Sequence, residues 1–514
     1  MPRIYRTLLL AAAAALCTAC GTNPVTGERE VQLISEAQEI QMGARAYGPA
    51  RQVQGGDYIV YPELTLYVQS VNQRLAQVSD RDLPYDINII NSSVPNAWAM
   101  PGGKMAINRG LLLELGSEAE LAAVLGHEIV HAAARHGAKS QERGLFLQSG
   151  VVATDILTGG RGGALAGGAL AGATLINSRY GREAELEADE YGMLYMVRAG
   201  YDPAAAVDLQ QTFVRLSQGS DPSWLDGLFA SHPPSAERVR RNQETAAELG
   251  NGELDVGRER YQRAIADLRR DKPAYDALDA ALAAAEDEDY VRAEQLINKA
   301  ISLQPREAKF HGMKGDLALQ AARYEDASRH YNRAIGLYPG YFGFFLHLGY
   351  ARFQLEDWNG ATRALERCND ILPNALAQKV LGDLALRRGD REQAIAYYEV
   401  AAQSESEVGQ AALVALIRLE LAEYPDKYIR TQVGVQDGKV AIAVDNLTPV
   451  TLTGVVVIAV FVDAQGQATS RVSRVKVPGE LEPRSRRIIE TRFTSTDGLR
   501  TAVEKARIAE TEEA

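Results

Sequence analysis

Cysteine is scarce in this chain of 514 residues, which has only 3 cysteines, and basic residues are fewer than acidic ones. Cys17 and Cys20 lie in the N-terminal segment, so their removal or lipidation leaves Cys368 alone and excludes a disulfide framework. The 55 Lys and Arg residues face 67 Asp and Glu residues, for a net charge of −12. This balance argues against nucleic acid as a partner and against a basic surface that docks on membranes.

The N-terminus predicts a signal peptide over residues 1–20. Two arginines precede an apolar run, Leu8 to Leu16, which is too short to cross a bilayer. Ala19-Cys20 matches the end of a lipobox, in which Cys20 becomes the lipidated first residue. Cys17 stands where leucine is usual, so ordinary cleavage to a soluble periplasmic protein remains the alternative. By analogy with bacterial lipoproteins, Gly21 at the next position favours a periplasm-facing anchor in the outer membrane.

Residues 127–131 have the sequence His-Glu-Ile-Val-His, an HExxH pattern. A capping box at 117–120 and the Ala/Leu-rich run after it predict a helix here. On a helix, His127 and His131 share one face and can hold one metal ion, while Glu128 can reach a water on that metal as general base. The alternative is a buried helix with two satisfied core histidines. That alternative must bury a charged glutamate between them, which is costly.

A catalytic zinc needs a third protein ligand and an open position. His136 is excluded as that ligand, because it lies roughly 140° around a continuous helix from His131. We expect it to end the helix ahead of Gly137, where its ring complements the helix dipole. Glu185 and Asp189, four residues apart on a second predicted helix, are better placed. Glu185 completes a His, His, Glu set, and Asp189 can hydrogen-bond a ligand histidine from behind. The alternative is a solvated acidic helix face, which we expect to include Glu183 and Glu190.

The HExxH followed by ExxAD resembles the HtpX and CAAX-endopeptidase-like family of zinc metallopeptidases (gluzincins). Residues 96–111 resemble the family's NAxxxPGG…GLL segment, a strand and hairpin beside the active site. Ser231-His232-Pro233-Pro234 and Gly21-Thr-Asn-Pro-Val-Thr-Gly27 resemble segments of the periplasmic BepA-like lipoprotein branch. The resemblance spans roughly residues 21–250 and includes four motifs in the right order.

The resemblance implies one Zn²⁺ per chain, with His127, His131 and Glu185 as ligands and Glu128 as base. It also implies that His232 can approach the zinc as a regulatory fourth ligand; the alternative is an exposed loop histidine. Substrate is expected to lie extended along an edge strand, held by main-chain hydrogen bonds. The residues assigned to this strand are Asn96, Ala97, Gly102 and Gly103. The implied substrates are misassembled envelope or outer-membrane proteins.

A repeat of 34 residues follows the peptidase region. Pro305, Pro339 and Pro373 recur at this tetratricopeptide (TPR) spacing, and small residues recur with them. Residues 272–425 fit about four helix pairs, which stack into an α-solenoid that binds polypeptide. Cys368 occupies a small-residue position and is expected to be structural. The aromatic residues of the middle repeats are expected to fill the core between repeats, with some lining a groove; they are Tyr331, Tyr338, Tyr341, Phe342, Phe344 and Phe345.

From about residue 428 the apolar period changes from 3.6 to 2, with turns at Asp437-Gly438 and Gln465-Gly-Gln. This pattern predicts a small immunoglobulin-like β-sandwich over residues 428–510. The Gly-rich segment 150–177 is expected to be a mobile loop or helical lid over the cleft. The zinc metallopeptidase domain itself is expected over residues 21–255, mainly helical with a small edge sheet.

The sequence therefore predicts a zinc-dependent metalloendopeptidase of envelope proteins, acting in protein quality control. The repeats are expected to recruit substrate or a partner, such as the outer-membrane assembly machinery. The alternative function is a repeat-based chaperone or assembly scaffold in which proteolysis is rare or latent.

Overall fold

The computed structural model describes residues 20–147, 180–219, 232–233, 235–250 and 254–509. The predicted signal peptide, apart from Cys20, and the predicted lid at 150–177 lie outside these residues. The chain divides into two compact units, residues 1–372 and 373–514, and each is described by itself. In the described residues no helix is both long and apolar enough to cross a membrane.

The first unit begins with two short strands, β1 (Cys20–Thr22) and β2 (Arg29–Val31), which pair in antiparallel fashion. Helix α2 (Glu36–Val53) follows, and Ser35 closes its N-terminus with a capping box. Helix α3 (Pro62–Ala76) starts on a proline, whose missing N–H has no partner to lose at the first helical position.

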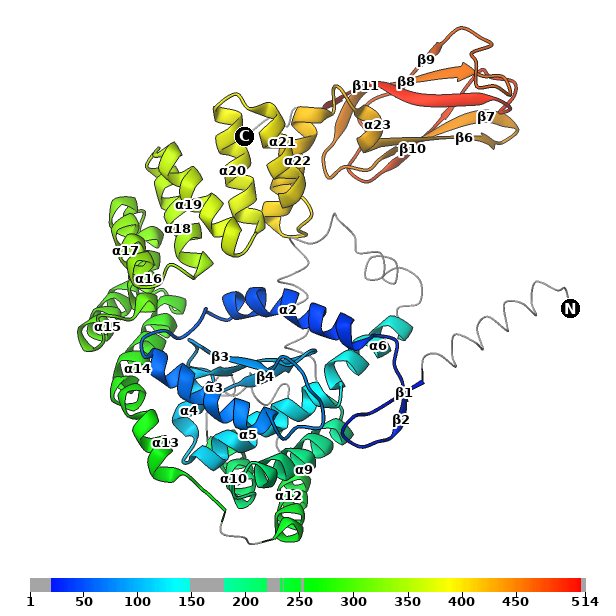
Figure 1. The fold of residues 1–514 in the computed structure, drawn as a ribbon. Coiled ribbons are helices and arrows are strands. Elements are labelled where there is room, and N and C mark those ends of the chain that lie inside the picture. Colours follow the sequence, from blue (N-terminus) through cyan, green and yellow to red (C-terminus); the bar gives the residue numbers. More distant parts are fainter. Residues whose placement is uncertain (1–19, 148–179, 220–231, 234, 251–253, 510–514) are drawn as a thin grey trace, which may run out of the picture. The chain divides into compact units, whose positions relative to one another are not determined.

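A three-stranded sheet has α2 against one face and α3 against the other (Figure 1). Its strands are β3 (Asp86–Ile90), β4 (Ala97–Met100) and β5 (Lys104–Asn108). Their order is β3-β5-β4, with β3 parallel and β4 antiparallel to β5. Gly102 and Gly103 form the β4–β5 turn with φ of 79° and 87°, a conformation that favours glycine. The predicted strand and hairpin at 96–111 are therefore present, and β4 is an edge strand.

The remaining helices of this part are α4 (Arg109–Glu114), α5 (Glu118–Ala133), α6 (His136–Leu147), α9 (Arg182–Arg198), α10 (Ala204–Gly219) and α12 (Ala236–Leu249). Side chains of α4, α5, α9, α10 and α12 contribute to the main hydrophobic core or pack against it.

Helices α5 and α9 approach each other backbone to backbone at Gly126 and Gly192. A Cβ added at Gly126 would stand 3.0 Å from the carbonyl oxygen of Gly192. A Cβ added at Gly192 would stand 3.0 Å from the backbone nitrogen of His127. Because neither glycine has a side chain, the two helices lie closer than ordinary side chains would permit.

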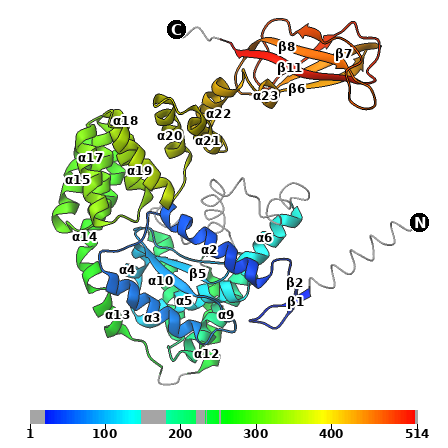
Figure 2. The same cartoon turned by 45° about the horizontal axis from the view of Figure 1, so that its top comes forward.

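Antiparallel helix pairs complete the first unit (Figure 2). Their alanines at the repeat positions 293, 327 and 361 are fully buried, as small packing residues should be. The helices are α13 (Arg258–Ala264), α14 (Ala266–Glu286), α15 (Tyr290–Leu303), α16 (Ala308–Gln320), α17 (Tyr324–Leu337), α18 (Phe342–Gln354) and α19 (Trp358–Ile371).

The α17–α18 turn is bonded to the end of α2. Gln52 Nε2 donates to the carbonyl of Gly340 over 2.8 Å, and Gln52 Oε1 accepts from the Phe342 amide over 3.0 Å. The Tyr338 hydroxyl accepts from the Asp57 amide over 3.2 Å. Of the repeat aromatics, Tyr331 and Phe344 are buried in the repeat core, whereas Tyr338 contacts the part of the unit that contains the sheet. The repeats and that part are thus joined by specific polar contacts.

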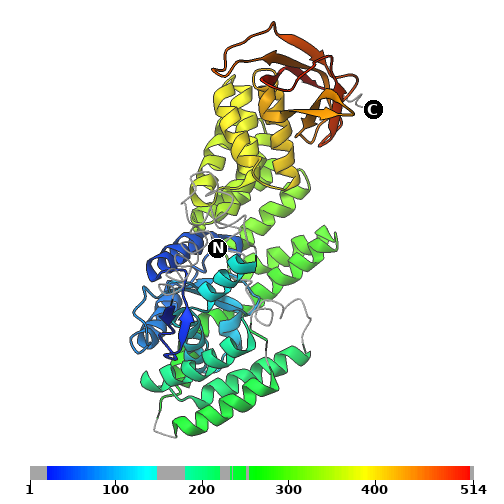
Figure 3. The same ribbon diagram turned by 90° about the vertical axis from the view of Figure 1, so that its right-hand side faces the viewer.

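The second unit contains further helices and two antiparallel sheets of three strands each, ordered β10-β7-β6 and β11-β8-β9. Apolar side chains of both sheets and of α22 form one core, and the strands are the orange-to-red elements of Figure 3. The predicted turn at Asp437-Gly438 joins β6 to β7. The helices are α20 (Ala375–Arg387), α21 (Arg391–Ala401), α22 (Glu407–Glu420) and α23 (Pro425–Tyr428). The strands are β6 (Ile429–Gln436), β7 (Lys439–Asn446), β8 (Leu452–Phe461), β9 (Ser473–Lys476), β10 (Arg486–Glu490) and β11 (Leu499–Ile508).

Candidate metal centre

Helix α5 carries the HExxH residues deep in the first unit. Ser117 caps the helix by accepting a hydrogen bond from the Glu120 amide over 3.2 Å. The helix then runs through Ala, Val and Leu residues that are buried almost throughout. Glu128 and His131 are 3% and 1% exposed, so the polar residues of the motif are desolvated with the core around them.

Helix α9 brings Glu185 to the two histidines. The Nε2 atoms of His127 and His131 lie 3.0 Å apart. A carboxylate oxygen of Glu185 lies 3.5 Å from Nε2 of His127, and the other lies 3.4 Å from Nε2 of His131. Zinc at about 2.0–2.1 Å from each of four tetrahedral donors requires donors about 3.3 Å apart. The spacing and the N, N, O chemistry of this set therefore fit zinc.

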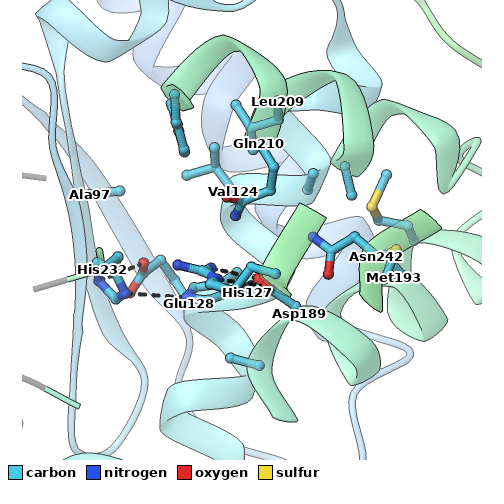
Figure 4. Close-up of a pocket in the computed structure, with 16 residues that line it drawn as sticks. Ala97, Val124, His127, Glu128, Asp189, Met193, Leu209, Gln210, His232 and Asn242 are labelled. Atoms are coloured by element: carbon cyan, nitrogen blue, oxygen red, sulfur yellow. Dashed lines mark hydrogen bonds and ion pairs between the residues drawn. The ribbon is translucent and has the colours of Figure 1, made fainter. Parts of the chain in front are cut away.

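His232, which lies between α10 and α12, faces the same point. Its Nδ1 is 3.2 Å from Nε2 of His127 (Figure 4). The same atom is 3.0 Å from Glu185 Oε1. Ligand atoms of His127, His131, Glu185 and His232 all lie within 4.8 Å of one another. His232 is 6% exposed, so it is not the exposed loop histidine of the alternative interpretation.

Asp189 and Arg238 lie behind His127. Asp189 Oδ1 accepts from His127 Nδ1 over 2.9 Å, so the Nε2 of that ring is turned toward the other donors. Arg238 of α12 donates hydrogen bonds to both carboxylate oxygens of Asp189, from Nε and Nη2, each over 2.7 Å. Its Nη1 lies 3.0 Å from Glu185. Sequence reasoning missed Arg238. The available signal was an arginine six residues beyond His232, in the first turn of a capped helix.

The charges of the site favour a cation at the histidines. Burial opposes a proton on His127, but Asp189 and Glu185 outweigh it and raise the pKa of His127 to about 10. Burial also opposes ionisation of Glu185, yet His232 and the hydrogen bonds of the other two histidines hold the pKa of this carboxyl well below its usual range. The carboxylates are thus arranged for positive charge between the rings, as a divalent metal would supply.

Glu128 lies beside the donor set, with its Oε1 3.5 Å from Nε2 of His232. Burial raises the pKa of its carboxyl, and its Oε2 has no hydrogen-bond partner among the residues that the structure describes. A buried acceptor without a partner is uncommon and indicates a group that awaits one. The carboxylate is therefore free to accept a proton beside the donor set.

The chain after α5 differs from the expectation. His136 was expected to end the HExxH helix, but α5 ends at Ala133 and His136 begins α6. Arg135 makes the break with a φ of 64° and is held by an ion pair with the buried Glu39. The break turns His136 back, so that its Nδ1 lies 2.8 Å from Nδ1 of His131. His136 is not in the donor set, as expected, but it does contact a member of it.

Tyr180, just before α9, covers the other side of His131. The two rings stack with their centroids 4.0 Å apart and their planes at 16°. Sequence reasoning did not single out this tyrosine.

A largely apolar pocket opens next to His127 and Glu128. Its walls come from α5, α9 and α10, and two buried amides, Gln210 and Asn242, point toward His127 in Figure 4. Gln210 Oε1 has no hydrogen-bond partner within the described part of the chain. The apolar lining residues are Ala97, Ala123, Val124, Ala188, Met193, Met196, Ala206, Leu209 and Phe213. The pocket can accept an apolar side chain beside the candidate metal centre.

The four residues assigned to the substrate strand lie along the β4–β5 hairpin. Ala97 is the first residue of β4 and also lines the apolar pocket. Asn96 precedes β4, and its Oδ1 has no hydrogen-bond partner among the described residues. Gly102 and Gly103 form the turn at the far end of the hairpin.

Comparison with known proteins gives a consistent result. Residues 62–246 match the model of "Peptidase family M48". The chain is 32% identical over 226 residues to the mitochondrial metalloendopeptidase OMA1 of Schizosaccharomyces pombe, covering 43% of this chain and 65% of the relative. It is 31% identical over 197 residues to the putative beta-barrel assembly-enhancing protease of Vibrio cholerae, covering 36% and 40%. It is 29% identical over 238 residues to the beta-barrel assembly-enhancing protease of Escherichia coli, covering 44% and 47%. The chain thus spans less than two thirds of each relative's length.

Proposed function

We propose that the chain is a zinc-dependent metalloendopeptidase, because residues 62–246 match the model of peptidase family M48. The observation that carries the proposal is the buried His127, His131 and Glu185 donor set, with Glu128 beside it. The Oε2 of Glu128 has no hydrogen-bond partner among the described residues. The residues of the donor set would hold a zinc ion, which would polarise the scissile carbonyl and lower the pKa of a water toward about 7.

The residues around the metal site have separate roles in the proposed reaction. Glu128 is the general base, because its Oε2 is a buried acceptor without a partner and can take the proton of the attacking water. Asp189 orients the ring of His127, and Arg238 holds Asp189 in place. His127, His131 and Glu185 are the metal ligands.

We infer that substrate lies along β4 as an added strand. Within the described residues, β4 pairs only with β5, so no strand takes up the hydrogen-bonding groups of its other edge, although its four residues are buried. Main-chain pairing depends little on the side chains of the substrate, which suits a protease that acts on varied, misassembled proteins. Selectivity then comes from the apolar pocket, which takes one side chain next to the scissile bond.

His232 is a fourth ligand of a latent state. Its Nδ1 lies among the other donor atoms, so it would occupy the position that a catalytic water needs. Movement of this residue, brought about by substrate or a partner, opens the site. The proposed switch supports the second candidate function, a chaperone or assembly scaffold in which proteolysis is rare.

The proposed setting is the bacterial envelope, facing the periplasm, with Cys20 as a lipid anchor in the outer membrane. Two relatives are named beta-barrel assembly-enhancing proteases, which supports envelope proteins as substrates and the outer-membrane assembly machinery as a partner. The repeats at 272–425 recruit them, and the sandwich at 428–510, which we assign as immunoglobulin-like, serves binding or spacing. The peptidase domain occupies residues 21–255, after the signal peptide.

Casein cleavage by the full chain and by Glu128→Gln tests the proposal. The wild type with zinc should cleave casein, and Glu128→Gln should not, although it binds zinc equally well. A chelator should abolish the cleavage and added zinc should restore it. Equal cleavage by both forms would refute Glu128 as the base, and no cleavage by either, even after His232→Ala, would favour the scaffold. A pull-down with Glu128→Gln then identifies trapped substrates.

A further inference from the structure

His131 has two ring nitrogens with different surroundings. Its Nε2 is one of the donor atoms and lies 3.0 Å from Nε2 of His127 and 3.4 Å from Glu185. Its Nδ1 points away from that set and lies 2.8 Å from Nδ1 of His136. For His127 the corresponding Nδ1 partner is the carboxylate of Asp189. On the side of the ring away from the donor set, the two histidines therefore contact different residue types.

Only one protonation pattern satisfies both rings when His131 binds a metal. A ligand nitrogen must be free of hydrogen, so His131 Nε2 is bare and its proton is on Nδ1. That N–H donates to Nδ1 of His136, which must then be bare as the acceptor. The proton of neutral His136 is consequently on Nε2.

The structure provides an acceptor for that second proton. Oε1 of Glu187 lies 3.5 Å from His136 Nε2. The same oxygen accepts a hydrogen bond from Asn23 Nδ2 over 3.0 Å. Glu187 lies two residues beyond Glu185 on α9, so one helix supplies both a donor to the metal centre and the end of this chain of contacts.

Asn23 is itself fixed by the turn that joins β1 to β2. Its Oδ1 accepts from the Val25 amide over 2.9 Å, and its carbonyl accepts from the Gly27 amide over 2.9 Å. Asn23 is 3% exposed and Val25 is 9% exposed in the main core. The N-terminal turn is thus built into the protein around the metal centre.

We propose that His136 is a positioning residue of the metal centre: it fixes the ring and tautomer of His131, with Glu187 and the N-terminal turn residue Asn23 behind it. The inference rests on the proposed function only in that it takes zinc as the ion at His131. It assigns a role to a histidine, a glutamate and an N-terminal turn that the reaction itself does not use.

Zinc affinity of the full chain, measured by competition with a chromophoric chelator, tests the proposal. His136→Ala should weaken zinc binding about 10- to 100-fold, as loss of such a support does at other metal sites. His136→Asn should recover most of the affinity, because its Oδ1 can replace Nδ1 as the acceptor. Circular dichroism and thermal unfolding of the zinc-free forms check that both variants fold.

A double-mutant cycle separates positioning from mere packing. Glu187→Ala should weaken zinc binding in the wild type but have little further effect in His136→Ala, since Glu187 acts through His136. The matched control is Glu190→Ala, an exposed glutamate of the same helix, which should change nothing.

Two results would overturn the proposal. One is zinc affinity of folded His136→Ala within twofold of the wild type; the other is a Glu187→Ala effect of equal size in both backgrounds. These readouts do not involve peptide cleavage. Failure of the proposed function would therefore appear as zinc binding without proteolysis, a different result.

Discussion

The ring of His232 stands edge-on to the ring of His127, with the centroids 5.0 Å apart and the planes at 77°. In this arrangement His232 Nδ1 is directed at the same point as the Nε2 of His127, at a separation of 3.2 Å. A loop residue is thereby engaged with the donor set that the HExxH helix presents.

His232→Ala should raise basal casein cleavage while the protein keeps its zinc. The substitution opens the fourth position but leaves His127, His131 and Glu185 as ligands. Cleavage rate and zinc content should be measured on the same preparation, with the His232→Ala, Glu128→Gln double variant as the inactive control. Unchanged or slower cleavage at full zinc content would contradict the switch.

Glu185→Gln should lose zinc or bind it weakly, because a neutral amide replaces the one anionic ligand. Glu187→Gln should keep zinc, since Glu187 is outside the donor set and a glutamine still offers His136 an acceptor oxygen. Elemental analysis of the purified variants decides the matter. Equal zinc in the wild type and Glu185→Gln would refute the ligand assignment.

Peptides with a large apolar side chain next to the cleaved bond should be preferred. Met193→Ala enlarges the pocket and should shift the preference toward bulkier, aromatic side chains, roughly tenfold or more in relative kcat/KM. Cleavage of a peptide mixture, read by mass spectrometry, measures the shift. Met313→Ala, in the repeats, is the control. An unchanged product pattern in Met193→Ala would show that this pocket does not determine which substrate side chain is preferred.

Gln52→Ala should loosen the repeats from the peptidase part. It leaves the Gly340 carbonyl and the Phe342 amide without their partner, at a cost of about 1–3 kcal/mol in the free energy of unfolding if both remain buried. Hydrogen exchange of the Phe342 amide should accelerate in the variant. Gln41→Ala, at an exposed position on the same helix, should have no such effect. Equal exchange in all three proteins would show that Gln52 does not hold the contact.

Helical spacing is local, so the sequence placed His127, Glu128 and His131 close together on one helix, and Glu185 and Asp189 on one face of another. That the two helices meet was implied only by the family resemblance. A fixed number of residues along one helix places side chains on one face whatever surrounds it. The 34-residue repeat and the strand alternation after residue 428 could be predicted for the same reason.

His136 could not be placed this way. The prediction extended α5 through it, whereas Arg135 breaks the helix by an ion pair to Glu39, 96 residues earlier. Arg238 reaches Asp189 across 49 residues, and Gln52 meets Gly340 across 288. Such contacts depend on tertiary packing, which periodicity in a single sequence does not report.

The approach of α5 and α9 at Gly126 and Gly192 has a consequence for any mutational survey of this protein. A Cβ at either position meets backbone atoms at 3.0 Å, so the helices that carry the histidines and Glu185 would have to shift by a few tenths of an ångström, and a longer side chain demands more. Such a shift acts on donor atoms that lie 3.4–3.5 Å apart. In a screen for lost proteolysis, substitutions of these two glycines can therefore score alongside those of the ligands. Inactivity at either position would therefore record the spacing between helices, although neither residue carries a chemical group for the reaction.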